Sequence, residues 1–201
     1  MKNVLLAMLF GVLLTGCGGQ NEEVAKLTAK DGKVQVMVKP AEAFVDAADV
    51  QALHSGDSIK TGEAAKASLE LIKDKSTISL GENSFLEIRN FNEKDLQQMS
   101  GTAIYKITPQ NKELKINTQH GVATVLGTVL RVDTDEQKTV VAVEEGKVGF
   151  RKNGSQQNVM IEAGHHYATD FAEEKAQALD PITREGLFNF DAGLKPIINP
   201  R

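Results

Sequence analysis

The chain has 201 residues with 23 basic and 27 acidic side chains, which gives a formal net charge of −4 at neutral pH. No run of basic residues suggests nucleic-acid binding, and a single cysteine, Cys17, excludes a disulfide within the chain. Tryptophan is absent, and 17 glycines separate short apolar runs. Because short apolar runs bounded by turn residues are typical of strands, the composition predicts an all-β fold.

Residues 1–16 predict a lipoprotein signal peptide. Lys2 gives a charged start, and residues 4–14 form an apolar run that is shorter than the roughly 20 residues a helix needs to cross a bilayer. The run ends in Leu14-Thr15-Gly16-Cys17, which resembles the bacterial lipobox. We therefore expect cleavage before Cys17 and attachment of acyl chains such as palmitate to it. The alternative is an ordinary secretory signal with an incidental cysteine.

Residues 17–30 are expected to form a polar, lipidated tether. Two glycines, and no aspartate, follow Cys17, and by resemblance to lipoprotein sorting in Gram-negative bacteria this favours the outer membrane over the inner one. Stable anchoring needs more than one acyl chain, a condition that a triacylated cysteine meets. We expect the protein to lie at the periplasmic face of the outer membrane, bound to it through the lipid.

The following segments alternate apolar and polar residues, as half-buried strands do. A first strand is expected over residues 32–38, and residues 41–53 fit either a strand plus a turn or one short helix. Residues 55–62 predict two turns around a very short strand, with Asp57 accepting hydrogen bonds from nearby backbone amides. Further strands are expected at residues 67–71, 77–80, 84–90 and 102–107, with a helical turn or ordered loop over residues 91–100.

Residues 114–150 predict the centre of the fold. Within them, residues 122–132 leave almost no polar face, so the pattern predicts one strand that is covered on both sides. Gly127 interrupts this run, and a glycine there indicates a bulge or the close approach of another backbone. Residues 133–138 predict a polar turn, which is followed by a β-branched run at residues 139–143.

These patterns resemble the FecR domain family. Residues 56–62 resemble its G-D-x-I-x-T-G motif, and residues 118–148 resemble its central strands, although Leu126 and Leu130 stand where the family commonly has Arg and Phe. The matching residues, all expected to be structural, are Gly56, Asp57, Thr61, Gly62, Thr118, Gly127, Thr128, Val132, Val141, Val143, Gly146, Val148 and Gly164. The resemblance implies one FecR-like β domain over residues 31–169.

Many short strands joined by tight turns fit a flattened β-roll or irregular β-solenoid, with a β-sandwich as the competing architecture. Residues 170–201 are expected to form a short C-terminal extension. Its charged stretch, residues 173–185, fits a helix broken by Pro181, and Leu187, Phe188 and Phe190 are expected to dock on the domain because exposed clusters of large apolar groups are unusual.

No set of residues predicts a catalytic, metal or cofactor site. His165 and His166 are adjacent, so on a strand they point to opposite faces and cannot share one ion without a bend. The same argument separates Glu144 from Glu145. Turns are the expected settings of His120 and of the acidic group Asp133, Asp135 and Glu136, which would otherwise hold calcium weakly.

Two function classes therefore compete. One is a non-catalytic lipoprotein that binds or scaffolds another envelope protein or a cell-wall polymer. The other, implied by the resemblance, is a component of envelope signal sensing. Sensors of the FecR type need a cytoplasmic segment and a membrane-spanning helix ahead of the domain, so with a lipoprotein signal in that place we do not expect direct contact with a sigma factor. The sequence gives no indication of the oligomeric state.

Overall fold

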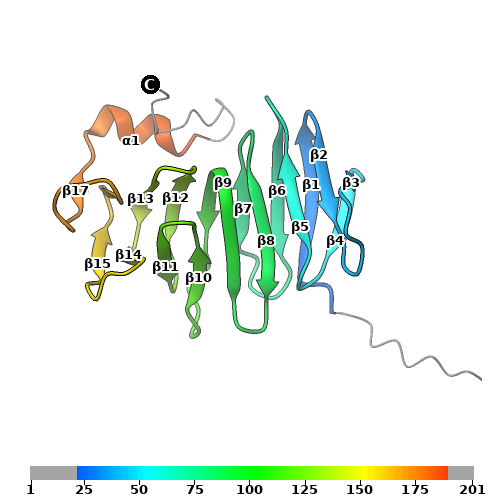
Figure 1. Cartoon of the computed structure of the whole chain (residues 1–201), viewed down its shortest axis with the longest axis horizontal. Coiled ribbons are helices and arrows are strands. Elements are labelled where there is room, and N and C mark those ends of the chain that lie inside the picture. Colours follow the sequence, from blue (N-terminus) through cyan, green and yellow to red (C-terminus); the bar gives the residue numbers. More distant parts are fainter. Residues whose placement is uncertain (1–21, 190–201) are drawn as a thin grey trace, which may run out of the picture.

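The computed structural model describes residues 22–189, which form many short strands and one short helix arranged in two layers (Figure 1). The first layer, sheet A, has the order β4 (Val50–Leu53), β1 (Ala25–Asp31), β6 (Lys66–Leu71), β7 (Thr77–Leu80), β9 (Asp95–Lys106), β12 (Val129–Thr134), β13 (Thr139–Glu145), β16 (His165–Ala168) and β17 (Gln177–Ala178).

The second layer, sheet B, packs against sheet A. Its order is β3 (Val45–Asp46), β2 (Val34–Met37), β5 (Ser58–Thr61), β8 (Phe85–Asn90), β9, β10 (Leu114–Asn117), β11 (Gly121–Val125), β14 (Lys147–Lys152) and β15 (Val159–Glu162). The inward side chains of both layers join in one hydrophobic cluster. The prediction of an all-β fold of many short strands is confirmed, and the sheet stays open rather than closing on itself.

Strand β9 makes the two layers one continuous sheet. Its first residues pair with β8 and β10 in sheet B, and its residues 101–106 pair with β7 and β12 in sheet A. The strand bends at Gly101, whose φ of +83° is rarely adopted by other residues and whose added Cβ would overlap the Cα of Ser84. Glycine is therefore required where β9 leaves one layer for the other.

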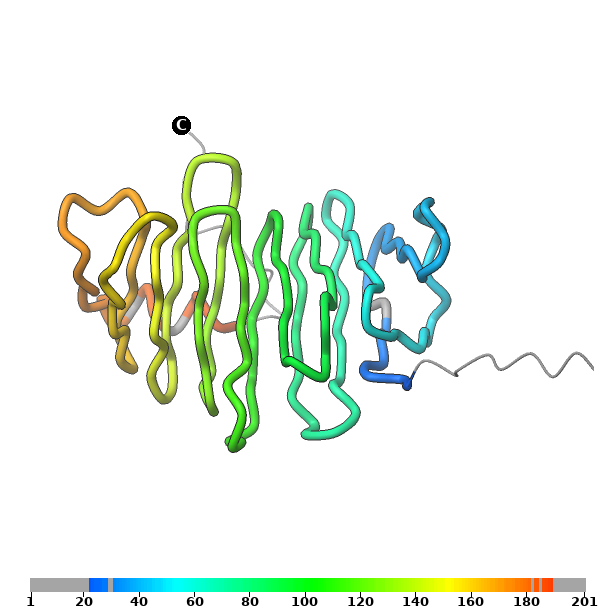
Figure 2. Tube along the Cα trace, turned by 60° about the horizontal axis from the view of Figure 1, so that its bottom comes forward, coloured from blue at the N-terminus to red at the C-terminus, as the bar shows by residue number. Residues whose placement is uncertain are grey.

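The chain passes to the opposite layer after every one or two strands, as the winding in Figure 2 shows. The packing of two layers is that of a sandwich, whereas the repeated crossing is that of a flattened roll. The two architectures left open by the sequence therefore describe different aspects of one fold. Each crossing brings residues that are distant in the sequence into neighbouring strands.

The single strand predicted over residues 122–132 is wrong. Strand β11 ends at Val125 in sheet B, and β12 starts at Val129 in sheet A, so residues 126–128 are a crossing rather than the middle of a strand. Strands β12 and β13 are covered on both faces, since almost all their residues are buried, and so are residues 102–105 of the adjacent β9. Strand β11 alternates buried and partly exposed residues.

The tether is shorter than predicted. Residues 25–31 form β1, which pairs with both β4 and β6, and Ala25 and Leu27 are fully buried. The lysines and threonine between the apolar positions hide the alternation of this strand in the sequence. Cys17 lies outside the described residues.

Two regions for which the sequence left a helix or a loop as an alternative also contain or lead into strands. Residues 41–53 contain β3 and β4 and no helix, while residues 91–94 form a turn that leads directly into β9. Within residues 22–189, no helix is long and apolar enough to span a membrane.

The C-terminal extension packs on the outer face of sheet A. Pro181 starts α1 (Pro181–Leu187) instead of breaking a helix, because a proline is tolerated in the first helical turn. The carboxylate of Asp180 caps the helix by accepting from the backbone amide of Thr183 at 2.9 Å. Leu187 is buried and α1 lies beside β12 and β13 (Figure 1). Phe188 is partly exposed, and Phe190 lies outside the described residues.

Beneath α1, sheet A carries a buried ion pair. Arg131 and Asp133 lie two residues apart on β12, so both point away from the main core, and each side chain is 1% exposed. Two hydrogen bonds join the guanidinium to the carboxylate, at 2.8 and 2.9 Å. The Asp133 carboxylate also accepts from the hydroxyl of Thr102, and Arg131 donates to the carbonyl of Leu187 at 2.9 Å. The expectation that Asp133 lies in a solvated turn is therefore wrong.

A first prediction concerns the bend of β9. Gly101→Ala should lower the free energy of unfolding by about 2–5 kcal/mol, since it adds overpacking to a left-handed backbone. Gly154→Ala is the matched control, because Gly154 has a similar φ of +79° but an added Cβ would meet no described atom within 4 Å. It should cost only about 1 kcal/mol. Urea unfolding of a soluble fragment that begins at Glu22 measures both, and equal costs would contradict the close approach of Ser84.

A second prediction concerns the buried ion pair. Asp133→Val leaves the Arg131 guanidinium buried without its carboxylate and should cost about 3–5 kcal/mol of stability. Adding Arg131→Met should restore a large part of this loss, because the double variant buries no unpaired charge. Glu70→Ala removes an exposed pair with Lys75 and should have a much smaller effect. Urea unfolding of each variant tests the coupling, and strictly additive costs would show that the pair does not act as a unit.

Candidate functional site

A shallow groove lies where two crossings of the chain meet on the side of sheet B. The first crossing joins β11 to β12, and the second joins β13 to β14. The groove is lined by Glu113, Thr124, Val125, Leu126, Gly127, Gly146, Lys147, Gly149, Asn158, Met160, Glu162 and Ala163. It therefore combines residues from β11, β14, β15 and the adjoining turns with Glu113, which directly precedes β10.

Two glycines let the crossings come together. A Cβ on Gly127 would lie 2.6 Å from the Cα of Pro109, so the predicted close approach of another backbone is present although the predicted strand is not. Gly146 has a φ of +79°, and its Cβ would lie 2.8 Å from the carbonyl oxygen of Gly127. Because neither position accepts a side chain, the floor of the groove consists of backbone at this point.

Two exposed apolar side chains belong to the groove. Leu126 is 47% exposed and Met160 is 50% exposed, both unusually high for large apolar residues. Met160 stands opposite Gly149 in the pairing of β14 with β15, and Gly149 in turn pairs with Thr124 of β11. The Asn158 side chain covers Gly149, since an added Cβ there would lie 2.9 Å from its amide nitrogen.

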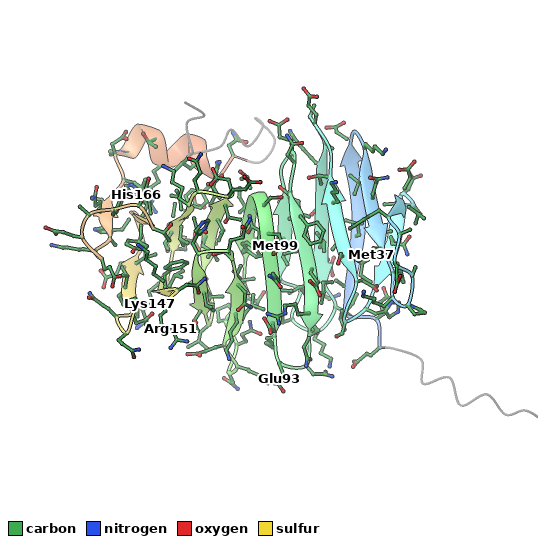
Figure 3. The ribbon with its side chains drawn as sticks, in the orientation of Figure 1. Met37, Glu93, Met99, Lys147, Arg151 and His166 are labelled. Carbon is green, nitrogen blue, oxygen red and sulfur yellow. The ribbon has the colours of Figure 1, made fainter. Side chains whose placement is uncertain are left out.

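Charged residues surround this apolar surface. Lys147 and Glu162 are directly paired across β14 and β15, and both are exposed. Arg151 lies on the same strand and face as Lys147, four residues further along β14, and Figure 3 labels the two near each other. Apolar, cationic and anionic groups together provide contacts for an extended segment with mixed side chains.

The two adjacent histidines do not form a metal site. His165 lies with its Nδ1 3.2 Å from the carbonyl oxygen of Ala163, whereas the ring of His166 packs edge-on against Phe171, with centroids 5.4 Å apart. Burial lowers the pKa of His166 below its ordinary value, and the neighbouring His165 adds to this effect. Within residues 22–189, no three His, Cys, Asp or Glu side chains gather as metal ligands would.

Of the remaining candidate groups, Asp135 and His120 have local structural partners. Asp135 closes the turn after β12 by accepting from the backbone amides of Gln137 and Lys138, at 2.7 and 2.8 Å. The Nδ1 of His120 lies 3.1 Å from the hydroxyl of Thr139. Glu136 and Glu145 are exposed, and the backbone carbonyl of Glu144 accepts from Arg184 at 2.7 Å.

Most other residues of the family motif hold crossings in place. Asp57 is fully buried and accepts from the backbone amides of Lys39 and His54, at 2.9 and 2.8 Å, as its position in the motif predicted. Thr61 donates to the carbonyl of Gly81 at 2.6 Å. The other contacts are backbone bonds of Gly56 to Ile88, Gly62 to Lys33 and Gly164 to Val143, the pairing of Thr128 with Ile107, and hydroxyl bonds of Thr118 with Gly121 and Thr139.

The groove itself was not predicted from the sequence. Its apolar residues are distant in the chain, since Leu126 directly follows β11 and Met160 lies on β15. Only the register of β11, β14 and β15 brings them to one groove. The available signal was the pair Gly127 and Gly146, which the sequence marked as structural.

Comparison with solved structures supports the fold. Two crystal structures of a candidate anti-sigma factor from Parabacteroides distasonis ATCC 8503 each superpose with a TM-score of 0.55 at 14% and 15% sequence identity. The matches cover 64% and 65% of this chain. The chain spans 63% of the length of these relatives. At this level of identity the likeness shows the fold alone.

Sequence comparison identifies the family of the central part. No protein of curated function matches the chain. The family described as FecR protein matches residues 57–149, which include the groove residues Gly127 and Gly146, while Gly56 and Gly164 lie outside the match. The resemblance seen in the sequence is therefore confirmed for this range, and the chain contains a FecR domain at residues 57–149.

Proposed function

We propose that this protein is a lipid-anchored, non-catalytic component of envelope signal regulation, and that its FecR domain binds an extended segment of another envelope protein. The observation that carries the proposal is the groove between β11, β14 and β15, with its exposed Leu126 and Met160. The groove is built from residues of the FecR domain and from β15 immediately after it.

The chemistry of the groove suits peptide recognition. Exposed apolar side chains gain from being removed from water, at roughly 25 cal/mol per Å² of buried apolar surface. Lys147 and Glu162 at the border add charge selectivity rather than much affinity, because exposed charges are well solvated. An extended partner segment can place an apolar side chain between Leu126 and Met160 and a charged one at either border.

The regulatory part of the proposal draws on the comparisons. The domain has the FecR family signature, and its fold resembles that of a candidate anti-sigma factor. The proposed anchor, Cys17, would keep this domain at the periplasmic face of the outer membrane, so its partner would be another envelope component. The alternative partner is a cell-wall polymer, which the polar groove residues Asn158 and Thr124 would contact.

A third prediction tests the groove. A photo-crosslinking amino acid in place of Met160 should capture one envelope protein in intact cells, which mass spectrometry of the purified product would identify. Leu126→Asp should lower the yield of this product several-fold, since it places a carboxylate on the apolar surface. The reduction should be visible without loss of the folded protein, because Leu126 is 47% exposed.

The matched control is Leu126→Met, which keeps an apolar side chain and should keep the yield of the product. A product that contains glycan instead of protein would replace the protein partner with a cell-wall polymer. Equal yields from the Asp and Met variants would show that this groove is not the binding surface.

A fourth prediction tests the anchor. Cys17→Ser removes the one cysteine of the chain and should abolish labelling by a clickable fatty acid. The unprocessed variant should no longer fractionate with the outer membrane as a mature lipoprotein does. Labelling that persists in the variant would refute acylation at Cys17.

A further inference from the structure

One end of the double layer carries two exposed valines. Val45 of β3 is 59% exposed and Val50 of β4 is 53% exposed. Within the described residues, β3 is the outermost strand of sheet B and β4 is the outermost strand of sheet A. Both strands terminate the layers on the same side, since their partners β2 and β1 follow one another in the chain. We call this surface, residues 45–53, the β3–β4 end.

The described chain enters the fold at this end. The backbone amide of Val24 donates to the carbonyl of Leu53 at 2.9 Å, and Glu22 forms an ion pair with Lys73 at 3.2 Å. Val50 is three residues from Leu53 along β4, which corresponds to about 10 Å. Figure 1 shows the start of the described chain directly below β3 and β4.

The length of chain between the proposed anchor and the fold is short. Five residue steps separate Cys17 from Glu22, and each step spans at most about 3.6 Å. An acylated Cys17 therefore lies no more than about 18 Å from Glu22. This step rests on the lipid anchor in the proposed function. With that anchor, the β3–β4 end lies next to the bilayer surface.

We infer that the β3–β4 end rests on the phospholipid bilayer through Val45 and Val50, and that the groove at Leu126 and Met160 faces away from the membrane. Seven strand spacings of about 4.8 Å separate β3 from β14 in sheet B, which places the groove about 34 Å from this end. Tethering supplies a high effective concentration, so weak apolar contacts suffice to hold the orientation.

The charges around the valines indicate which lipids this end fits. Glu42, Asp46 and Asp49 are exposed beside Val45 and Val50 in the sequence, and Asp46 accepts a hydrogen bond from Gln35. These carboxylates would be repelled by an anionic lipid surface. The end is therefore suited to zwitterionic phospholipids.

The test uses the full lipidated protein with a photo-crosslinking residue in place of Val45 or Val50, and in place of Met160 as the distal control. Each protein is reconstituted in phosphatidylcholine vesicles that contain fluorescent phosphatidylethanolamine. Crosslinking to the fluorescent lipid from positions 45 and 50 should exceed that from position 160 by about tenfold, as expected for a tethered near end. Replacing half of the phosphatidylcholine by phosphatidylglycerol should lower the yield.

Equal lipid crosslinking at all three positions would overturn the orientation, and so would a crosslinked dimer from position 45, which would make this end an interface between two copies. An unchanged yield with phosphatidylglycerol would overturn the preference for zwitterionic lipids. Fatty-acid labelling distinguishes a failure of the orientation from a failure of the anchor. A labelled protein without lipid crosslinks from positions 45 and 50 refutes the orientation alone, whereas an unlabelled protein refutes the anchor and this inference with it.

Discussion

The tightness of the crossings between the two layers is the constraint on which the rest of the structure depends. At Gly101 the chain passes so close to Ser84 that a Cβ would overlap its backbone, and at Gly127 the same holds for Pro109. Short crossings such as these keep consecutive strands of the two layers around one core. The glycines therefore set the spacing of the crossings, and the β-branched residues on the strands fill the space between the layers.

The groove follows from the same constraint. A crossing that consists of backbone leaves less surface covered than a strand with side chains, so two crossings that meet at Gly127 and Gly146 produce a depression. The side chains next to the crossings cannot point into the core, since the chain is turning there. Leu126 is exposed for this reason, although both β11 and β12 are otherwise well packed.

The sequence predicted the strands whose alternation is regular and missed those in which polar residues mask it. In β6, Ala67, Leu69 and Leu71 are buried as predicted. In β1, lysine and threonine obscure the pattern, so the sequence predicts a tether where the structure has a strand. The prediction of one strand over residues 122–132 was wrong for the opposite reason. Their apolar character is continuous because one part lies in a half-buried strand, one part turns and one part is covered by α1.

For the candidate residues, the sequence likewise predicts local roles but not contacts between distant segments. Asp57 and the glycines of the family motif could be assigned because their roles depend on local backbone geometry. Asp133 could not, since an acidic residue after a strand usually marks a turn. Its burial depends on Arg131 on the same face and on a helix more than forty residues later. Leu126 and Met160 likewise line one groove only through the register of three strands, which no local pattern encodes.

The two outer faces differ in how they are covered. On sheet A, the central strands are covered by α1, and the buried pair Arg131–Asp133 makes this cover costly to remove, since exposing it would break the contact with Leu187. On sheet B, the corresponding strands keep an exposed outer face, and the groove lies there. The C-terminal extension packs outside the core between the two layers. It covers the outer face of sheet A near β12 and β13, whereas the groove on the side of sheet B stays exposed.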